Sequence, residues 1–399
     1  MSQFNMDRVK ALGEKYEDAL ISRRRYLHEH AELSFQEENG YAWLHENLSK
    51  LDVVFDDRIS PNSIIATIDS GKEGPHIGFR ADYDALPILE ENDLPFQSVN
   101  KGVMHACGHD AHAAILLTLA EAMDQNRDLL QGKVSFIFQQ GEEKLPGGAR
   151  KIIEEGGLED MDCVYALHVR TNLNIGQFDA EPGARSSTAA VYEMKISGSG
   201  GHTGFPHTAT DPMMAATMLM DEIYKLRLTA VDPKDLATIA VSYIHSDNLN
   251  TPNVYSKEIT LGGTIRTLSN KVAAELPGKL EELGQKVCDM KGCQFSFKHT
   301  PGYASVENNG AYWSYVDKAG RALGYENVST QDVMGAEDFS FMLLEKPGAY
   351  FTIGTVDPSD PRTTGARHTP NLFMGEKGIR VGFEIMLGTY LTTLAELEA

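Results

Sequence analysis

Short apolar runs that stop at polar residues alternate with helical segments along this chain, and this alternation constrains the fold more than any other feature. The runs are HIGFRAD at 76–82, KVSFIFQQGEE at 133–143, CVYALH at 163–168 and AYFTIGT at 349–355. Helices are predicted between them, at 110–123 and 147–157. Strands that alternate with helices imply an α/β fold, in which a mostly parallel sheet carries helices on both faces.

The polar residues that follow these runs are of types that bind metals. In an open α/β sheet, ligands collect beyond the carboxyl ends of the strands. We therefore expect one cluster at that edge of the sheet, formed by Asp82, Glu142, Glu143, His168 and His368.

The amino-terminal segment predicts helices rather than strands. Between residues 6 and 51 the apolar residues recur at helical spacing, which indicates two amphipathic helices with ELSFQE, residues 32–37, between them. His28 and His30 lie here without a second type of metal ligand nearby, so we expect them to pack against the helices or to face solvent.

The pattern changes in the middle of the chain. Segments 188–197 and 258–266 alternate apolar and polar residues as half-exposed strands do. A helix with Asp211 at its N-cap and Pro212 next to it is predicted between these strands, and another at 270–287. This indicates a small α+β domain inserted into a larger catalytic domain. The predicted boundaries are 1–186 for the first part of the catalytic domain, 187–297 for the inserted domain and 298–399 for the second catalytic part.

Length and charge narrow the classes of function. A chain of 399 residues fits two domains, and a net charge of −21 argues against nucleic-acid and anionic membrane partners. The amino terminus has no apolar signal region, and no apolar run approaches the ~18 residues of a membrane span, so we expect a cytoplasmic protein. The 4 cysteines are too few and too scattered for a disulfide framework, and we expect reduced thiols.

The stretch MHACGHDAHAA, residues 104–114, permits three kinds of site: a cysteine nucleophile with its base, half of a zinc finger, or one corner of a metal-dependent centre. A zinc finger requires a second close ligand pair at set spacing, and none lies within reach. A cysteine nucleophile would leave the glutamates at 142–143 without a purpose. Cys107 and His109 better suit two metal ligands on one loop, with Asp110 as the N-cap of the next helix.

Glu142 and Glu143 strengthen the metal interpretation. Two adjacent carboxylates after a buried strand are costly to desolvate unless a cation compensates them. A metal hydrolase needs one carboxylate as a ligand and another as the general base for a metal-activated water. A solvated acidic turn is the alternative, and EEKLPGG at 142–148 also fits it.

A set of motifs, taken in order and spacing, makes nearly the full chain resemble the metal-dependent aminoacylase/carboxypeptidase superfamily. The closest subgroup contains amidohydrolases such as hippurate hydrolases, plant auxin-conjugate hydrolases and N-acetyldiaminopimelate deacetylases. The motifs are GFRADYDALPILE, GVMHACGHDAHAA, FQQGEEKLPGGARKIIEEG, GSGGHTGFPHTATDP, GTIRT, and GAEDFSFMLLEKPGAYFTIGT with RHTPN.

The resemblance implies a role for each matching residue. It implies a two-metal site in which Cys107 is the bridging ligand, joined by His109, Glu143, His168 and His368. Glu142 takes the position of the general base, and Asp84 that of a carboxylate supporting the metals. His202 matches a histidine that reaches the partner's active site in dimeric members, and Asn253 and Arg266 match substrate-binding positions. His105, His112 and His207 are expected to pack or to form supporting hydrogen bonds.

The expected activity is hydrolysis of the amide bond in N-acyl amino acids or related small conjugates, by a homodimer or higher homo-oligomer. Two divalent ions are expected per subunit, with Mn²⁺ favoured and Zn²⁺ an alternative. Two alternatives are a dipeptidase or exopeptidase of the same fold and an inactive metal or amino-acid binding protein. A third is catalysis by a cysteine nucleophile, which would remain active in the presence of chelators. The chain departs from the subgroup at three places: Gln140-Gly141, where Pro-Ala is usual, Arg170-Thr171 and Tyr255-Ser256. These departures concern the choice of substrate rather than the catalysis.

Overall fold

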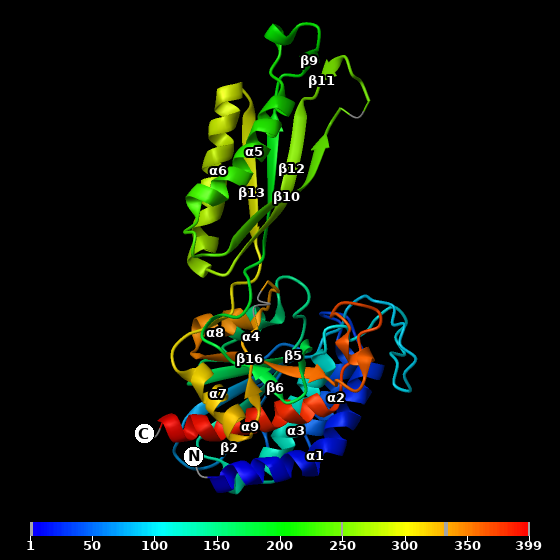
Figure 1. The fold of residues 1–399 in the computed structure, drawn as a ribbon, viewed down its shortest axis with the longest axis vertical. Helices are drawn as coiled ribbons and strands as arrows, with labels where there is room; N and C mark the ends of the chain where they lie inside the picture. Colours follow the sequence, from blue (N-terminus) through cyan, green and yellow to red (C-terminus); the bar gives the residue numbers. More distant parts are fainter. Residues whose placement is uncertain (1–2, 249, 331–333, 398–399) are drawn as a thin grey trace. The chain divides into compact units, whose positions relative to one another are not determined.

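The computed structural model describes residues 3–248, 250–330 and 334–397, which form two compact units (Figure 1). The first unit comprises Met1–Arg185, Val306–Gln331 and Asp338–Ala399. The second comprises Ser186–Ser305 and Asp332–Glu337. Each unit has its own hydrophobic core.

The first unit is built on an eight-stranded sheet with the order β1-β2-β4-β3-β5-β16-β6-β15. The four neighbouring strands β4, β3, β5 and β16 are parallel, which confirms the predicted α/β class. Antiparallel strands β1, β2 and β6 extend this centre. The strands of this sheet are β1 Val54–Phe55, β2 Ile64–Asp69, β3 His76–Asp82, β4 Lys133–Gln139, β5 Cys163–Asn174, β6 Gln177–Asp179, β15 Glu326–Asn327 and β16 Gly348–Val356. A separate pair is formed by β7 Gly183–Ala184 and β14 Glu307–Asn308.

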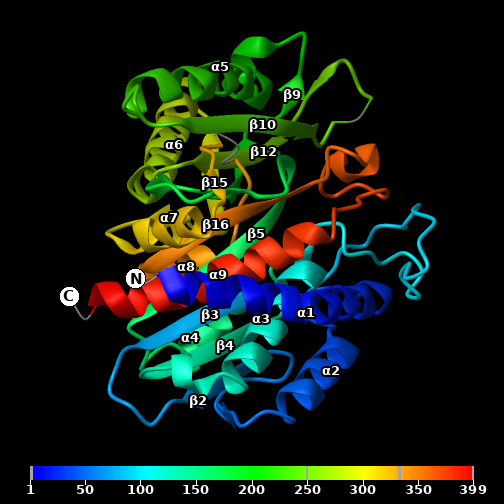
Figure 2. The same ribbon diagram turned by 60° about the horizontal axis from the view of Figure 1, so that its bottom comes forward.

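Helices cover both faces of this sheet, as predicted (Figure 2). The larger core lies beneath α1 Gln3–Glu29, α2 Glu38–Leu48, α3 His109–Asp124, α7 Tyr312–Ala322 and α9 Lys377–Leu397. The opposite core lies beneath α4 Gly148–Glu154 and α8 Phe339–Glu345. The two predicted amino-terminal helices are confirmed as α1 and α2, and residues 32–37 lie between them.

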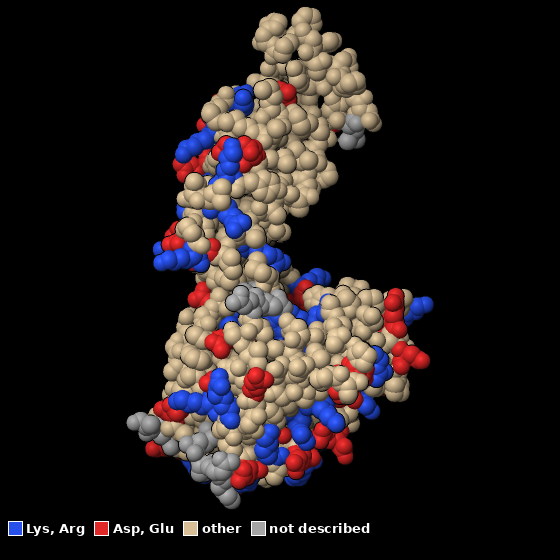
Figure 3. All heavy atoms as spheres, in the orientation of Figure 1, with Lys and Arg blue, Asp and Glu red and all other residues tan. Residues whose placement is uncertain are grey.

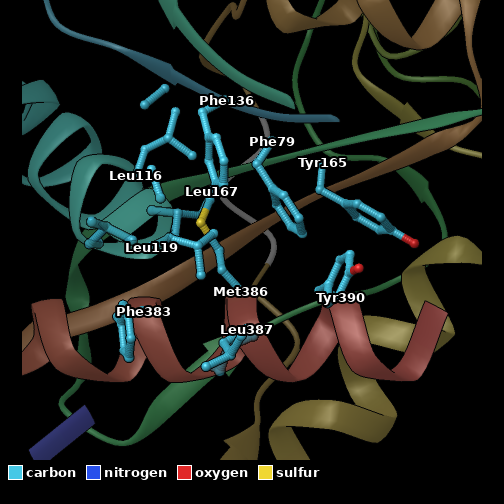
Figure 4. Packing of buried hydrophobic residues seen from close by; sticks show 14 of the residues in the cluster. Phe79, Leu116, Leu119, Phe136, Tyr165, Leu167, Phe383, Met386, Leu387 and Tyr390 are labelled. Atoms are coloured by element: carbon cyan, nitrogen blue, oxygen red, sulfur yellow. The ribbon is translucent and has the colours of Figure 1, made fainter. Parts of the chain in front are cut away.

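Alternation along each strand divides its side chains between the two cores. On β5, Tyr165 and Leu167 pack with Phe79, Phe136 and the α9 side chains (Figure 4). Val164 and Ala166 face the other core, and His168 follows in the same register. Because Arg80 pairs with Ala166, the ends of β3 and β5 bring Asp82 level with His168.

The start of α3 corrects one prediction. Asp110 is not the N-cap: that position belongs to Gly108, whose φ is +96°, and α3 begins at His109. The carboxylate of Asp110 is instead buried, where it accepts hydrogen bonds from Arg24 Nε at 2.7 Å and His28 Nδ1 at 2.8 Å. Because α3 begins at His109, Asp110 lies in the first turn of the helix rather than before it, and its carboxylate takes two charged donors instead of a capping N–H.

The second unit has a four-stranded antiparallel sheet, in the order β10-β12-β8-β13, with two helices packed on its core. Its elements are β8 Ala190–Ser197, β9 Gly201–His202, α5 Pro212–Ala230, β10 Ala237–Ser246, β11 Val254–Tyr255, β12 Glu258–Thr267, α6 Asn270–Lys291 and β13 Gln294–Pro301. The predicted strands at β8 and β12 and both helices are confirmed, as is Asp211 as the cap of α5, which accepts from Met213 N at 2.9 Å. Strands β10 and β13 were not predicted.

Two further expectations concern the cysteines and membranes. All 4 cysteines are free thiols, as predicted. Among the described residues, no helix combines the length and the apolar character needed to cross a bilayer.

Candidate metal centre

The expected metal ligands converge at the carboxyl edge of the parallel strands in the first unit. Cys107 and His109 lie where the chain enters α3, Glu143 follows β4, and His168 lies on β5. His368 lies in the segment between β16 and α9. Among the described residues, five groups of three side chains have ligand atoms within 4.8 Å of one another. Two of these groups share Cys107: one adds His109 and His168, and the other adds Glu143 and His368.

Asp84 sets the direction of the His109 ring. Nδ1 of His109 lies 3.1 Å from both the backbone oxygen and Oδ1 of Asp84, so Nδ1–H donates there and Nε2 faces the cluster. The other carboxylate oxygen of Asp84 accepts from Ser34 Oγ at 2.7 Å and from Glu143 N at 2.9 Å. One buried carboxylate therefore contacts two of the expected ligands from behind.

His168 is oriented by its own strand. Its Nδ1 donates to the backbone oxygen of Val169 at 2.7 Å, which leaves Nε2 at 3.4 Å from Cys107 Sγ and 3.3 Å from Arg367 NH1. Burial, together with the nearby His112 and Arg367, holds the pKa of His168 well below its usual value. The ring is therefore neutral, the form in which imidazole binds a metal.

His368 is held close to Glu143 by an unusual backbone. Its φ is +61°, a conformation that non-glycine residues adopt at a cost of about 1–3 kcal/mol and that clusters at functional sites. The His368 N–H donates to Ala106 O at 2.7 Å, and its Nε2 lies 3.2 Å from Glu143 Oε1. The neighbouring Cys107 thiol and Glu143 carboxylate raise the pKa of His368 to about 10.

His112 supports the neighbouring strands rather than joining the two Cys107 groups. Its Nδ1 donates to Asp82 Oδ1 at 2.6 Å, and its Nε2 accepts from Val169 N at 3.0 Å. Arg80 NH1 donates to the second oxygen of Asp82 at 2.9 Å. Asp82, expected as a possible ligand, is thus already bound by two side chains, although its Oδ2 lies 3.7 Å from His109 Nε2. His105 is buried, and burial lowers its pKa to about 4.

A second buried network went unnoticed in the sequence. Arg80 NH2 donates to Asp338 Oδ1 at 2.8 Å, and Gln139 Nε2 donates to both oxygens of Asp338, at 2.9 and 2.8 Å. This network ties β3 and β4 to the start of α8, just behind the Glu142 turn. The buried position of Arg80 inside an apolar strand, HIGFRAD, was the signal that could have pointed to it.

The chemistry of the cluster fits divalent metal ions. Two of its buried atoms, His109 Nε2 and Glu143 Oε1, have no hydrogen-bond partner among the described residues. Leaving buried polar atoms unpaired is costly, and a cation at this point would satisfy both. Thiolate, imidazole and carboxylate together suit Zn²⁺ or Mn²⁺.

The expected residues of the second unit lie at two different ends of it. The β9–β11 ribbon places His202 opposite Val254, and the backbone oxygen of Asn253 accepts from Thr203 N at 3.0 Å. Arg266 lies near the far end of β12, where NH1 donates to Met334 O at 3.1 Å. Arg266 lies eight residue steps along β12 from Glu258, the end of the strand that leads toward Asn253, which corresponds to roughly 25 Å.

The likeness to known proteins extends over most of the chain. Residues 78–392 match the peptidase family M20/M25/M40. The chain belongs to this family. The family resemblance inferred from the sequence motifs is thereby confirmed, and with it the prediction of an enzyme that hydrolyses amide bonds.

Relatives of this M20 chain span almost its full length. Thermostable carboxypeptidase 1 of Saccharolobus solfataricus is 34% identical over 354 residues, 88% of this chain and 89% of the relative. The N-acetylcysteine deacetylase of Bacillus subtilis is 32% identical over 366 residues, 91% of this chain and 93% of the relative. A solved Bacillus subtilis structure described as a dinuclear metal binding peptidase of the M20 family is 28% identical, with a TM-score of 0.83 over 96% of this chain and 99% of that one.

Proposed function

We propose that this M20 chain is a two-metal amidohydrolase that removes the acyl group from N-acyl amino acids or related small conjugates. The observation that carries the proposal is the pair of unsatisfied buried atoms, His109 Nε2 and Glu143 Oε1, next to Glu142. A relative that deacetylates N-acetylcysteine, by its name, supports the substrate class. The net charge of −21 and the free thiols support a cytoplasmic protein without nucleic-acid partners.

Five residues would hold the metals. Cys107 belongs to two ligand groups, one with His109 and His168 and the other with Glu143 and His368, so it would help to hold both ions. When bound, such ions lower the pKa of water and polarise the scissile carbonyl. This ligand set suits both Mn²⁺ and Zn²⁺. Mn²⁺ is our favoured ion and Zn²⁺ the alternative.

Glu142 is the proposed general base. It is buried, it neighbours Glu143 in the chain, and its carboxylate is grouped with those of Glu143 and the ring of His109. In this role Glu142 accepts a proton from the attacking water and passes it to the leaving amine. In the second unit, His202 would stabilise the developing oxyanion, Asn253 would bind the substrate, and Arg266 would bind its carboxylate in a bidentate manner.

A second copy of the chain is required if His202, Asn253 and Arg266 act on one substrate. Within one copy, the ribbon that carries His202 and Asn253 lies roughly 25 Å from Arg266, farther than a single amino-acid substrate spans. A partner could supply His202 and Asn253 while this chain supplies Arg266. This arrangement supports the proposal of a homodimer in which His202 acts across the interface.

The outer edge of β10 has the composition of such an interface. β10 is the edge strand of its sheet, and the residues 237–246 contain no Asp, Glu, Lys or Arg. Ile244 is 43% exposed, and Tyr224 and Leu228 on α5 are 53% and 76% exposed. In Figure 3 the charged residues of this unit gather over its helices, and its strand edge and ribbon are largely without charge. An open, uncharged edge can pair with the same edge of a second copy.

The substitution Glu142→Gln tests the mechanism. We expect metal content to stay at the parent level while turnover of N-acetyl and N-benzoyl amino acids falls by about three orders of magnitude or more. Glu159→Gln, an exposed change on the same unit, is the matched control. Near-normal turnover of the Glu142 variant would refute the mechanism, and parent activity that survives chelators would favour Cys107 as a nucleophile.

An exopeptidase is the second candidate, because the Saccharolobus solfataricus relative is a carboxypeptidase by name. Dipeptides assayed beside N-acyl amino acids separate the two functions. Faster turnover of the dipeptides would move the assignment to a peptidase. Metal-dependent binding of either substrate without hydrolysis would identify an inactive binding protein.

A further inference from the structure

The ELSFQE segment, residues 32–37, lies between α1 and α2 and contacts the backbone that carries the expected site. It runs beside the end of β3, where Leu33 forms a bridge with Ala85 and Ala85 N donates to Glu32 O at 2.8 Å. The segment is therefore fixed against the strand end that leads into the site. Its own side chains then reach two of the loops around the expected metal ligands.

Glu37 is the most unusual side chain of this segment. It is completely buried, and its Oε1 accepts a hydrogen bond from Gly141 N at 2.7 Å. Its Oε2 is buried without a hydrogen-bond partner among the described residues. A buried carboxyl with one unsatisfied oxygen is costly, and an apolar side chain of similar size would fill the same space. Its carboxylate thus binds the backbone of the residue directly before Glu142.

Contacts from the 32–37 segment hold the turn at Gly141 in its conformation. Gly141 has a φ of +66°, and Phe35, whose ring packs directly against Gly141, also has a φ of +66°. The left-handed conformation is costly for phenylalanine and is kept only where surrounding contacts fix it. The segment and the turn thus hold each other in place.

Buried carboxylates hold the backbone on both sides of Glu142. Glu37 accepts from Gly141 N, and Asp84 accepts from Glu143 N at 2.9 Å. With the N–H groups before and after it fixed, the Cα–Cβ bond of Glu142 has a defined direction. A general base loses much of its effect when it is misaligned by about 1 Å, so this fixation matters for the rate.

We propose that Glu37 is a positioning residue for Glu142, which acts by accepting the Gly141 N–H and makes no contact with substrate or metal. The proposal rests on the proposed function of Glu142 as general base. It requires the acceptor oxygen of residue 37 rather than its charge. Glutamine keeps that oxygen, and methionine keeps the length of the side chain without it.

The test compares Glu37→Met with Glu37→Gln in the full-length protein loaded with Mn²⁺. With the best N-acyl amino acid substrate of the panel, we expect kcat of the Met variant to fall about tenfold or more while KM stays within about twofold. Bound metal should stay at the parent level in both variants. The Gln variant should keep kcat within about threefold of the parent, because it retains the hydrogen bond. Gln36→Met, an exposed neighbouring change, is the control.

Three results would overturn the proposal: parent kcat in the Met variant, an equal loss in the Met and Gln variants, or loss of metal in parallel with activity. If the Met variant does not fold, the Gln variant decides, since a reduced kcat there contradicts a role as acceptor. Glu142→Gln is measured in parallel. An active Glu142 variant refutes the proposed function, whereas an inactive one beside a fully active Glu37→Met refutes only the positioning role.

Discussion

His368 Nε2 lies 3.2 Å from Glu143 Oε1, although 225 residues of chain separate the two side chains. Both face Cys107, and Glu143 Oε1 lacks a hydrogen bond among the described residues. A cation between them would remove the need for His368 to carry a proton. Metal content and the integrity of this pair should therefore be linked.

His368→Ala should lower the metal content of the purified protein from two ions per chain to about one, because one of the two groups sharing Cys107 loses a ligand. The variant should also gain less thermal stability on metal addition than the parent, for which saturation at 100 times the Kd contributes about 2.7 kcal/mol. Elemental analysis and calorimetry measure both. The control is His207→Ala, an exposed histidine of the second unit. Unchanged metal content in His368→Ala would contradict the ligand set.

The metal-free protein should show a pH dependence that comes from Glu37. Burial and the nearby charge of Asp84 raise the pKa of Glu37 to about 7, from 4.5 for a free side chain. As the pH rises from 5 to 8, the unfolded chain loses this proton before the folded chain does. The free energy of unfolding therefore falls by up to about 3 kcal/mol, because each tenfold change in proton affinity corresponds to about 1.36 kcal/mol.

Glu37→Gln removes this loss, because glutamine does not ionise. In the chelator-treated protein, the two forms should melt at similar temperatures at about pH 5, and the Gln variant should melt higher at about pH 8. Scanning calorimetry at both pH values measures the difference. A difference that is the same at both would show that Glu37 ionises normally.

The buried cluster around Asp110 should be essential for stability. Asp110 binds Arg24 and His28, and His28 Nε2 lies 3.0 Å from Glu90 Oε1. Asp110→Ala would leave Arg24 and His28 without their shared partner and should cost about 3–5 kcal/mol in the free energy of unfolding. Asp128→Ala, which removes an exposed partner of Arg8, should cost less than about 1 kcal/mol. Urea titration compares them, and equal costs would contradict the assignment.

The edge of β10 should determine the oligomeric state. Ile244→Lys places a charge on the open edge and should convert the proposed dimer into a monomer in sedimentation velocity. Activity should be lost with it, because the proposed contribution of His202 from a second copy is removed. Met290→Lys is the matched control, since Met290 is 63% exposed on α6, away from β10. A dimer that survives Ile244→Lys would place the interface elsewhere.

Local patterns in the sequence determined much of the fold. The alternation on β3, β4 and β5, the helical spacing of α1 and α2, and the Asp211-Pro212 start of α5 are each encoded within a few residues, so they could be predicted. Strand β10 was not predicted, because residues 242–245 in its second half are exposed on both faces and show no alternation of buried and exposed positions. The expected ligands could be named because each stands at the end of a strand or beside a motif.

Only the tertiary structure decided which polar side chains position other groups through hydrogen bonds. Asp110 looked like a helix cap, and packing of α1 against α3 turned it into a partner of Arg24 and His28. Glu37 carried no signal in the sequence, because its partner Gly141 is 104 residues away. A side chain's local pattern fixes its element and its face, whereas its hydrogen-bond partners depend on how distant elements pack and which groups that packing removes from water.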